Sequence, residues 1–265
     1  MTERWIDLDG LVNMRDLGGL PTRDGGHTAS GRLIRSDNLQ DLTDADVQRL
    51  VDELGVTDVV DLRTEHEVHI EGPGPLRRVE ALTHHHHSLI EERLQGESAT
   101  EVGERALLAP WDEKRPERDA RFWAEHYLGY LARRPDSVEA ALRVIADAEG
   151  ATVVHCAAGK DRTGTVVAMA LDVAGVPRDE IVADYVLTAE RIDAIIGRLL
   201  PREAYGAALK EQKVEDQLPR AESIEAILDA VHDGWGGAPG WLRDRGWSEA
   251  DVERLRARLT EPASR

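Results

Sequence analysis

The sequence predicts an α/β fold in which a central, mainly parallel sheet is flanked by helices. Short β-branched apolar runs alternate with segments whose apolar residues recur at helical spacing, a pattern typical of parallel strands covered by helices. The chain has 265 residues, a length that suits one undivided α/β domain with a sizeable core. Neither an internal repeat nor a low-complexity linker divides it, so we expect a single domain over residues 1–265.

The first third of the chain predicts one strand–helix–strand unit. Leu33 and Ile34 are expected to lie in a strand, and Thr43 is expected to cap a helix that includes residues 47–54. Gly55 ends that helix, and residues 56–62 have the apolar, β-branched character of a buried strand. This unit is the first sign of the parallel sheet.

Residues 84–120 are the least regular part of the chain, and we interpret them as a surface excursion beside the functional cleft. The run of histidines at 84–87 raises the question of a metal site or a tag. Consecutive residues cannot all face one ion, so the run is better explained as a solvated loop. Helical patterns resume at 122–130 and 137–148.

The last third is expected to be mostly helical, over residues 178–262. A buried helix over 165–173 precedes it and stops at Gly175 and Pro177. Three late tryptophans are expected to anchor a C-terminal helical cap, and stacking on a ligand is the alternative role. The helical patterns cover 178–199, 221–233 and 248–260, and the tryptophans are Trp235, Trp241 and Trp247.

The most informative segment runs from His155 to Gly164. It follows the strand pattern of 152–154 and precedes the helical pattern of 166–171, so a tight loop joins a strand to a helix start. That geometry gathers backbone N–H groups in front of a helix dipole and binds a dianion. Cys156 is the only cysteine, and a thiol placed there should ionise easily because the dipole and Arg162 favour the thiolate.

These features predict that Cys156 is a nucleophile aimed at phosphorus and that Arg162 clamps the phosphoryl oxygens. The alternative is a buried structural cysteine in a strand-to-helix turn. The surrounding residues favour the nucleophile, because a histidine before the cysteine, two glycines and an Arg-Thr pair at the loop end occur together.

The Cys-x5-Arg-Thr loop resembles the signature of the cysteine-dependent phosphatases of the protein tyrosine phosphatase superfamily. Further segments are similar to a bacterial branch of atypical tyrosine and lipid phosphatases, and together they cover nearly the whole chain except about 84–120. The resemblance implies hydrolysis of phosphotyrosine, and in some members of phosphoserine, phosphothreonine or phosphoinositides. It also implies a tyrosine-phosphatase-like fold with a helical lid over the active site. The similar segments are 13–19, 33–39, 60–65, 184–188 and 240–244.

The resemblance also implies roles within the loop. Cys156 forms a phosphocysteine, and Thr163 donates its hydroxyl to the thiolate. His155 fixes the loop by hydrogen bonding rather than acting as a base. The chain lacks a Trp-Pro-Asp triplet, and in this branch the loop aspartate, here Asp161, serves as general acid and later as base. The alternative for Asp161 is structural, namely pairing with one of three arginines. These are Arg15, Arg35 and Arg63.

Other residues are expected to bind the phosphate or its surroundings. Lys160, one of only four lysines, either meets a second phosphate group, as in a phosphoinositide, or only adds local charge. Asp61 either accepts from loop N–H groups or orients Arg162, and Arg63 lines the cleft or forms a surface salt bridge with Glu65 or Glu67. The remaining loop positions expected to contact phosphate are Ala157, Ala158, Gly159 and Gly164.

The composition of the chain argues against two classes of binding partner. Acidic residues outnumber basic ones by 51 to 33, for a formal net charge of −18, so nucleic acid and anionic membrane surfaces should repel the chain.

No run reaches the length of a membrane span and no secretory signal is visible, so we expect a cytoplasmic location, although some relatives use a non-classical export route. One cysteine excludes an intramolecular disulfide. The predicted chemistry needs neither a metal nor a cofactor.

Two competing functions use the same loop. A phosphate-recognition module would keep the loop without turnover, and a rhodanese-like sulfurtransferase also holds a cysteine among N–H groups. The Arg162-Thr163-Gly164 ending and the motif at 13–19 favour a phosphatase over both. We therefore expect phosphorylated proteins or phosphoinositides as substrates.

Overall fold

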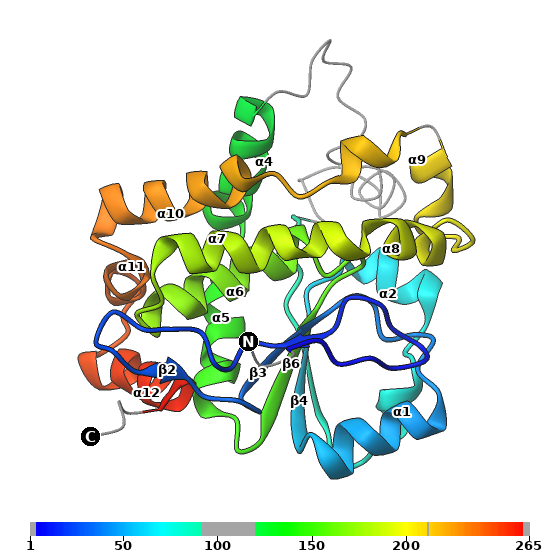
Figure 1. Cartoon of the computed structure of the whole chain (residues 1–265), viewed down its shortest axis with the longest axis horizontal. Coiled ribbons are helices and arrows are strands. Elements are labelled where there is room, and N and C mark those ends of the chain that lie inside the picture. Colours follow the sequence, from blue (N-terminus) through cyan, green and yellow to red (C-terminus); the bar gives the residue numbers. More distant parts are fainter. Residues whose placement is uncertain (1–3, 92–119, 211, 262–265) are drawn as a thin grey trace.

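The computed structural model describes residues 4–91, 120–210 and 212–261, and it confirms the predicted α/β architecture (Figure 1). The main sheet has five strands in the order β1-β3-β6-β4-β5. Pairing is parallel from β3 through β6 and β4 to β5, and only β1 is antiparallel to its neighbour. The strands are β1 (Arg15–Asp16), β3 (Leu33–Ser36), β4 (Val56–Asp61), β5 (Thr83–His86) and β6 (Ala151–His155), and a separate antiparallel pair joins β2 (His27–Thr28) to β7 (Thr260–Glu261).

The predicted helices are present, with shifts of a few residues at their ends. Thr43 caps the first helix through a capping box, as its position before the apolar pattern predicted. The helices and helical turns are α1 (Asp44–Gln48), η1 (Arg49–Glu53), α2 (Glu65–Glu71), η2 (Pro75–Arg78), α4 (Ala120–Arg133), α5 (Pro135–Asp147), α6 (Asp161–Val173), α7 (Arg178–Val186), η3 (Leu187–Arg191), α8 (Ile192–Leu199), α9 (Gly206–Lys210), η4 (Val214–Gln217), α10 (Ala221–Trp235), α11 (Ala238–Asp244) and α12 (Glu249–Leu259).

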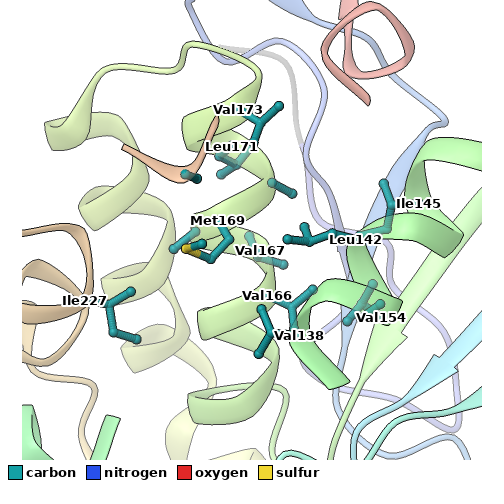
Figure 2. Close-up of a cluster of buried hydrophobic side chains, with 14 of the residues drawn as sticks. Val138, Leu142, Ile145, Val154, Val166, Val167, Met169, Leu171, Val173 and Ile227 are labelled. Carbon is teal, nitrogen blue, oxygen red and sulfur yellow. The ribbon is translucent and has the colours of Figure 1, made fainter. Parts of the chain in front are cut away.

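Helix α6, which starts at the predicted phosphate loop, lies at the centre of the larger core. Figure 2 shows its side chains, including Val167 and Met169, between Leu142 of α5 and Ile227 of α10. Burial of each such side chain stabilises the packing by about 1.5–3 kcal/mol. The helix that carries the site is therefore fixed on several sides.

The opposite face of the sheet is covered by the N-terminal segment, α1, η1 and η2. Ile34, Val59 and Val153 from three neighbouring strands pack there against Leu50 and Leu76. With helices on both faces, the sheet strands are buried and the carboxyl ends of β4 and β6 are left to form a site.

The histidine run corrects the prediction for residues 84–86, which were expected in a surface excursion. They belong to β5, which pairs in parallel with β4 at the sheet edge. Their rings have partners: His85 Nε2 lies 2.8 Å from Asp58 Oδ1, and His86 Nε2 lies 2.7 Å from the Arg63 carbonyl. Identical neighbours carry no period-two pattern, so the strand was invisible in the sequence. Residues 92–119 lie outside the described part of the chain.

The C-terminal cap rests on two of the three expected tryptophans. Trp241 and Trp247 are buried, and the Trp247 indole donates to Glu139 of α5 over 2.8 Å. Trp235 is 40% exposed, which corrects its predicted role as an anchor. Among the described residues, no helix combines the length and apolar character that crossing a bilayer needs.

Candidate active site

A pocket opens where β6 gives way to α6, at the carboxyl end of the central strand. Cys156, Lys160, Asp161 and Arg162 line it, as the sequence predicted from their spacing. Ala157 and Ala158 line it as well. Asp161 is the first residue of α6, so the pocket faces the positive end of that helix's dipole.

Gly159 is required by the shape of the loop. Its φ is +65°, and a Cβ there would lie 2.5 Å from the backbone of Ser36. An L-residue would therefore meet both backbone strain and a collision with β3. Glycine lets the loop lie directly against the neighbouring strand.

Three consecutive loop carbonyls are bound from behind by other segments. The Asn38 N–H donates to the Ala157 carbonyl over 3.0 Å, and Asn13 Nδ2 donates to the Ala158 carbonyl over 2.8 Å. Arg35 Nη2 donates to the Gly159 carbonyl over 2.8 Å. Because a peptide N–H points opposite to its carbonyl, these bonds turn the N–H groups of the following residues toward the pocket. The motifs at 13–19 and 33–39 thus shape the loop.

Two of the arginines behind the loop share one buried carboxylate. Arg15 Nε and Arg35 Nη1 donate to Asp184 of α7 over 3.0 and 2.7 Å, and all three side chains are buried. Burial alone would raise the pKa of Asp184, but the two guanidinium groups hold that pKa well below its ordinary value. The structural alternative for Asp161 was a pair with Arg15, Arg35 or Arg63. Arg15 and Arg35 do not form that pair, because both are bound to Asp184.

Arg162 is held by Glu67, a residue that sequence reasoning did not assign to the site. Arg162 Nη1 and Nη2 donate to Glu67 Oε2 and Oε1 over 2.6 and 2.9 Å. Burial would lower the pKa of Arg162, but Glu67 and Cys156 raise it well above its ordinary value, so the guanidinium stays charged. The available signal was Thr64-x-x-Glu67, a capping box that the structure contains and that places Glu67 at the start of α2.

Asp61 and Arg63 lie behind the loop rather than in the pocket. Arg63 Nε and Nη2 donate to Asp61 Oδ1 and Oδ2 over 2.9 and 2.6 Å, and Arg63 is buried, which excludes the expected surface salt bridge. The expected contact between Asp61 and Arg162 is replaced by the Glu67 pair. Two residues of separation let Arg63 reach Asp61 locally, while Glu67 on α2 faces Arg162.

His155 lies beside this pair as a neutral group. Its Nδ1 is 3.3 Å from the Cys156 carbonyl, and its Nε2 is 3.7 Å from Asp61 Oδ2. Burial lowers the pKa of His155 to about 4, although Asp61 acts in the opposite direction. A neutral, fully enclosed imidazole suits the predicted role of fixing the loop.

Asp161 has a tyrosine and a lysine as its neighbours. Tyr127 of α4 donates its hydroxyl to Asp161 Oδ1, and Lys160 Nζ lies 3.5 Å from the same oxygen. Lys160 also donates to the Gln217 carbonyl over 2.7 Å. Within the described residues, the Thr163 hydroxyl has no hydrogen-bond partner, so its predicted bond to Cys156 is not formed here.

The wall opposite the loop is apolar. Ile192, Ile195 and Leu199 of α8 line the pocket together with Leu209 of α9, and Tyr130 of α4 is also part of the lining. Sequence reasoning missed this wall because an apolar helix face usually indicates core. The pocket therefore combines the charged side chains of the loop with apolar walls that suit an aryl or alkyl group.

The chain is similar to known proteins over most of its length. The profile of the "Tyrosine phosphatase family" matches residues 6–261. A tyrosine-protein phosphatase of Nostoc commune is 31% identical over 233 residues, covering 86% of this chain and 74% of the relative. The triple specificity protein phosphatase PtpB of Mycobacterium tuberculosis is 30% identical over 291 aligned residues, covering 96% of this chain and 98% of the relative.

Proposed function

The chain belongs to the tyrosine phosphatase family and is a phosphoric monoester hydrolase, and from that premise we propose that it hydrolyses phosphotyrosine through a phosphocysteine on Cys156. The observation that carries the proposal is one pocket lined by Cys156, Asp161 and Arg162. A thiol, a carboxyl and a guanidinium are the three groups that a two-step phosphoryl transfer requires.

In the first step, the Cys156 thiolate bonds to phosphorus in line with the leaving oxygen, and the bond between phosphorus and that oxygen breaks. Asp161 gives its proton to the leaving oxygen, which departs as a phenol or alcohol. In the second step, a water molecule loses a proton to the Asp161 carboxylate while its oxygen bonds to phosphorus. The S–P bond then breaks, which releases inorganic phosphate and restores the thiolate.

The surrounding charges support both steps. Arg162 keeps its positive charge beside the phosphoryl oxygens, and the N–H groups turned inward by the bound carbonyls of 157–159 add further donors. These donors are fixed before the substrate arrives, because Glu67, Asn13 and Arg35 hold them. The barrier is lowered most by such preorganised groups.

The walls of the pocket bear on the choice of substrate. The isoleucines of α8 suit the ring of phosphotyrosine, and Lys160 in the lining can meet a second phosphate group. The M. tuberculosis relative is described as a triple specificity protein phosphatase. We therefore extend the proposal to phosphoserine, phosphothreonine and phosphoinositide esters as slower or alternative substrates.

The test is phosphate release from a phosphotyrosine peptide, a phosphoserine peptide and a phosphoinositide, with Cys156→Ser as the control. We expect release by the wild type, fastest from phosphotyrosine, and none by the variant. Release by the variant would contradict the phosphocysteine route. A wild type that binds phosphate without turnover would instead indicate a recognition module.

A further inference from the structure

Two tyrosines outside the pocket lining lie beside the candidate proton donor, and the reaction as proposed uses neither. Tyr127 comes from α4 and Tyr185 comes from α7, and both are buried. The hydroxyls of Tyr127 and Tyr185 lie 2.6 Å apart, and Tyr127 also donates to Asp161 Oδ1. Burial of hydroxyls away from water is costly. Two buried hydroxyls that are hydrogen-bonded to each other and to the candidate proton donor are therefore expected to have a role.

The hydrogen bonds run in one direction. Asp161, as a carboxylate, only accepts, so the single proton of Tyr127 points to it. Tyr185 must then donate to the Tyr127 oxygen. Burial raises the pKa of Tyr127 well above its ordinary value, so this hydroxyl keeps its proton. The chain of donors starts at Tyr185 of α7 and ends at Asp161, the first residue of α6.

Packing fixes the two rings that form this chain. The rings of Tyr127 and Tyr185 meet edge to face, with centroids 6.1 Å apart and planes at 89°. Gly164, on the first turn of α6, makes room for this arrangement, because a Cβ there would lie 2.9 Å from the Tyr185 ring. The loop glycine thus admits Tyr185 instead of approaching the phosphate itself.

The contacts of Asp161 distinguish its two oxygens. Among the described residues, Tyr127 and Lys160 make polar contacts with the carboxylate, and both contact Oδ1. Oδ2 has no partner among the described residues, and Asp161 lines the pocket. An oxygen without a competing donor is the one free to carry and exchange a proton.

We propose that Tyr127, held in place by Tyr185, is a positioning residue that binds Oδ1 of Asp161 and leaves Oδ2 to exchange protons with the leaving group and with water. This inference rests on the proposed function and on Asp161 as its acid. Tyr127 touches neither substrate nor phosphate in this role. It acts through the orientation of the carboxyl, because a proton donor works only within hydrogen-bond reach of the leaving oxygen.

The experiment compares kcat/KM for two substrates that differ in how much they need a proton. A phosphotyrosine peptide expels a basic phenolate, while p-nitrophenyl phosphate expels a stable anion. Tyr127→Phe should lower kcat/KM on the peptide by about 10-fold or more and on the activated ester by less than about 3-fold. Tyr185→Phe should show the same preference with a smaller loss, since Tyr127 keeps its bond to Asp161.

A double-mutant cycle separates this role from a general loss of structure. Asp161→Asn should show the substrate preference in full, and adding Tyr127→Phe to it should change the preference no further. Tyr130→Phe is a comparison variant within the pocket lining: its hydroxyl lies 2.8 Å from His126 Nε2 instead of on Asp161, so its losses should not follow how much a substrate needs a proton. Thermal unfolding midpoints identify variants that are merely destabilised.

The outcomes are distinct. Equal losses on both substrates for Tyr127→Phe, or additive effects with Asp161→Asn, would overturn the positioning role while the phosphatase proposal stands. If Tyr127→Phe fails to fold, Tyr185→Phe decides by the same ratio. A wild type without Cys156-dependent turnover on either substrate would overturn the proposed function and this inference together.

Discussion

Arg162 places a positive charge in the pocket lining and forms an ion pair with Glu67. Its guanidinium is bound on both terminal nitrogens by Glu67, and the two side chains are largely buried. A bidentate pair of this kind fixes the plane of the guanidinium as well as its position. Glu67 thus fixes the position of the guanidinium in the pocket lining.

Glu67→Gln tests this dependence. The amide oxygen can still accept from the Thr64 N–H, so the cap of α2 survives, but the ionic hold on Arg162 is lost. We expect kcat/KM for a phosphotyrosine peptide to fall on the order of 10- to 100-fold. Glu80→Gln, an exposed change of the same charge, is the control and should have little effect. Equal kinetics for the two variants would contradict the role of Glu67.

Single residues divide sharply in how well the sequence predicts them. Cys156, Gly159 and Arg162 share one short loop, so their spacing alone was enough to predict the candidate site. Glu67 and Tyr127 are 95 and 34 residues away from their partners in the loop. Contacts over such separations depend on how helices pack, which local patterns do not encode.

At the scale of elements, α7 is joined to the strands behind the loop by charge. Asp184 accepts from Arg15 of β1 and from Arg35 of β3, all of them buried. Arg35 in turn holds the Gly159 carbonyl. Helix α7 contributes no residue to the pocket lining, yet the carboxylate of Asp184 links it through Arg35 to the loop at Gly159.

Asp184→Asn should be strongly destabilising, because it leaves two buried guanidinium groups without their counter-charge. We expect a loss of about 3–5 kcal/mol in the free energy of unfolding, measured by urea denaturation. Asp229→Asn removes an exposed partner of Arg178 and should cost no more than about 1 kcal/mol. Similar losses for the two variants would show that burial does not increase the contribution of the Asp184 ion pairs to the free energy of unfolding.

Elements were predicted where a local signal exists and missed where it does not. Thr43 and the apolar spacing after it marked α1 correctly, because a cap is a local hydrogen bond. The strand β5 was taken for a loop, since four identical histidines hide the alternation of a half-buried strand. The pairing of β5 with β4 is a tertiary contact, and the histidine run alone does not predict it.

At the scale of the whole molecule, acid sensitivity follows from a histidine that is buried without charge. The pKa of His155 is lowered by burial to about 4, while an unfolded histidine titrates near 6.5. Between these values the unfolded state binds more protons, so stability present above pH 6.5 is lost as the pH falls toward 4. The paired carboxylates Asp61 and Asp184 keep pKa values below the ordinary range and lose their contribution only at lower pH.

Urea unfolding at about pH 7 and about pH 5 should therefore show a loss of about 2 kcal/mol attributable to His155. His155→Gln cannot take up this proton, so the same acidification should cost the variant correspondingly less. Changes in net charge affect both proteins alike and cancel in the comparison. An identical pH dependence in wild type and variant would contradict a buried neutral His155.

The strand order has a consequence for synthesis on the ribosome. In the five-stranded sheet, β6 lies between β3 and β4, although it is the last of the five to be made. Until residues 151–155 emerge, β3 and β4 lack the strand that joins them, and the edges that β6 would cover stay open to pairing with another chain. The nascent chain thus remains exposed to misassociation until the strand that precedes Cys156 closes the gap, so the sheet is completed only when the candidate loop is about to be made.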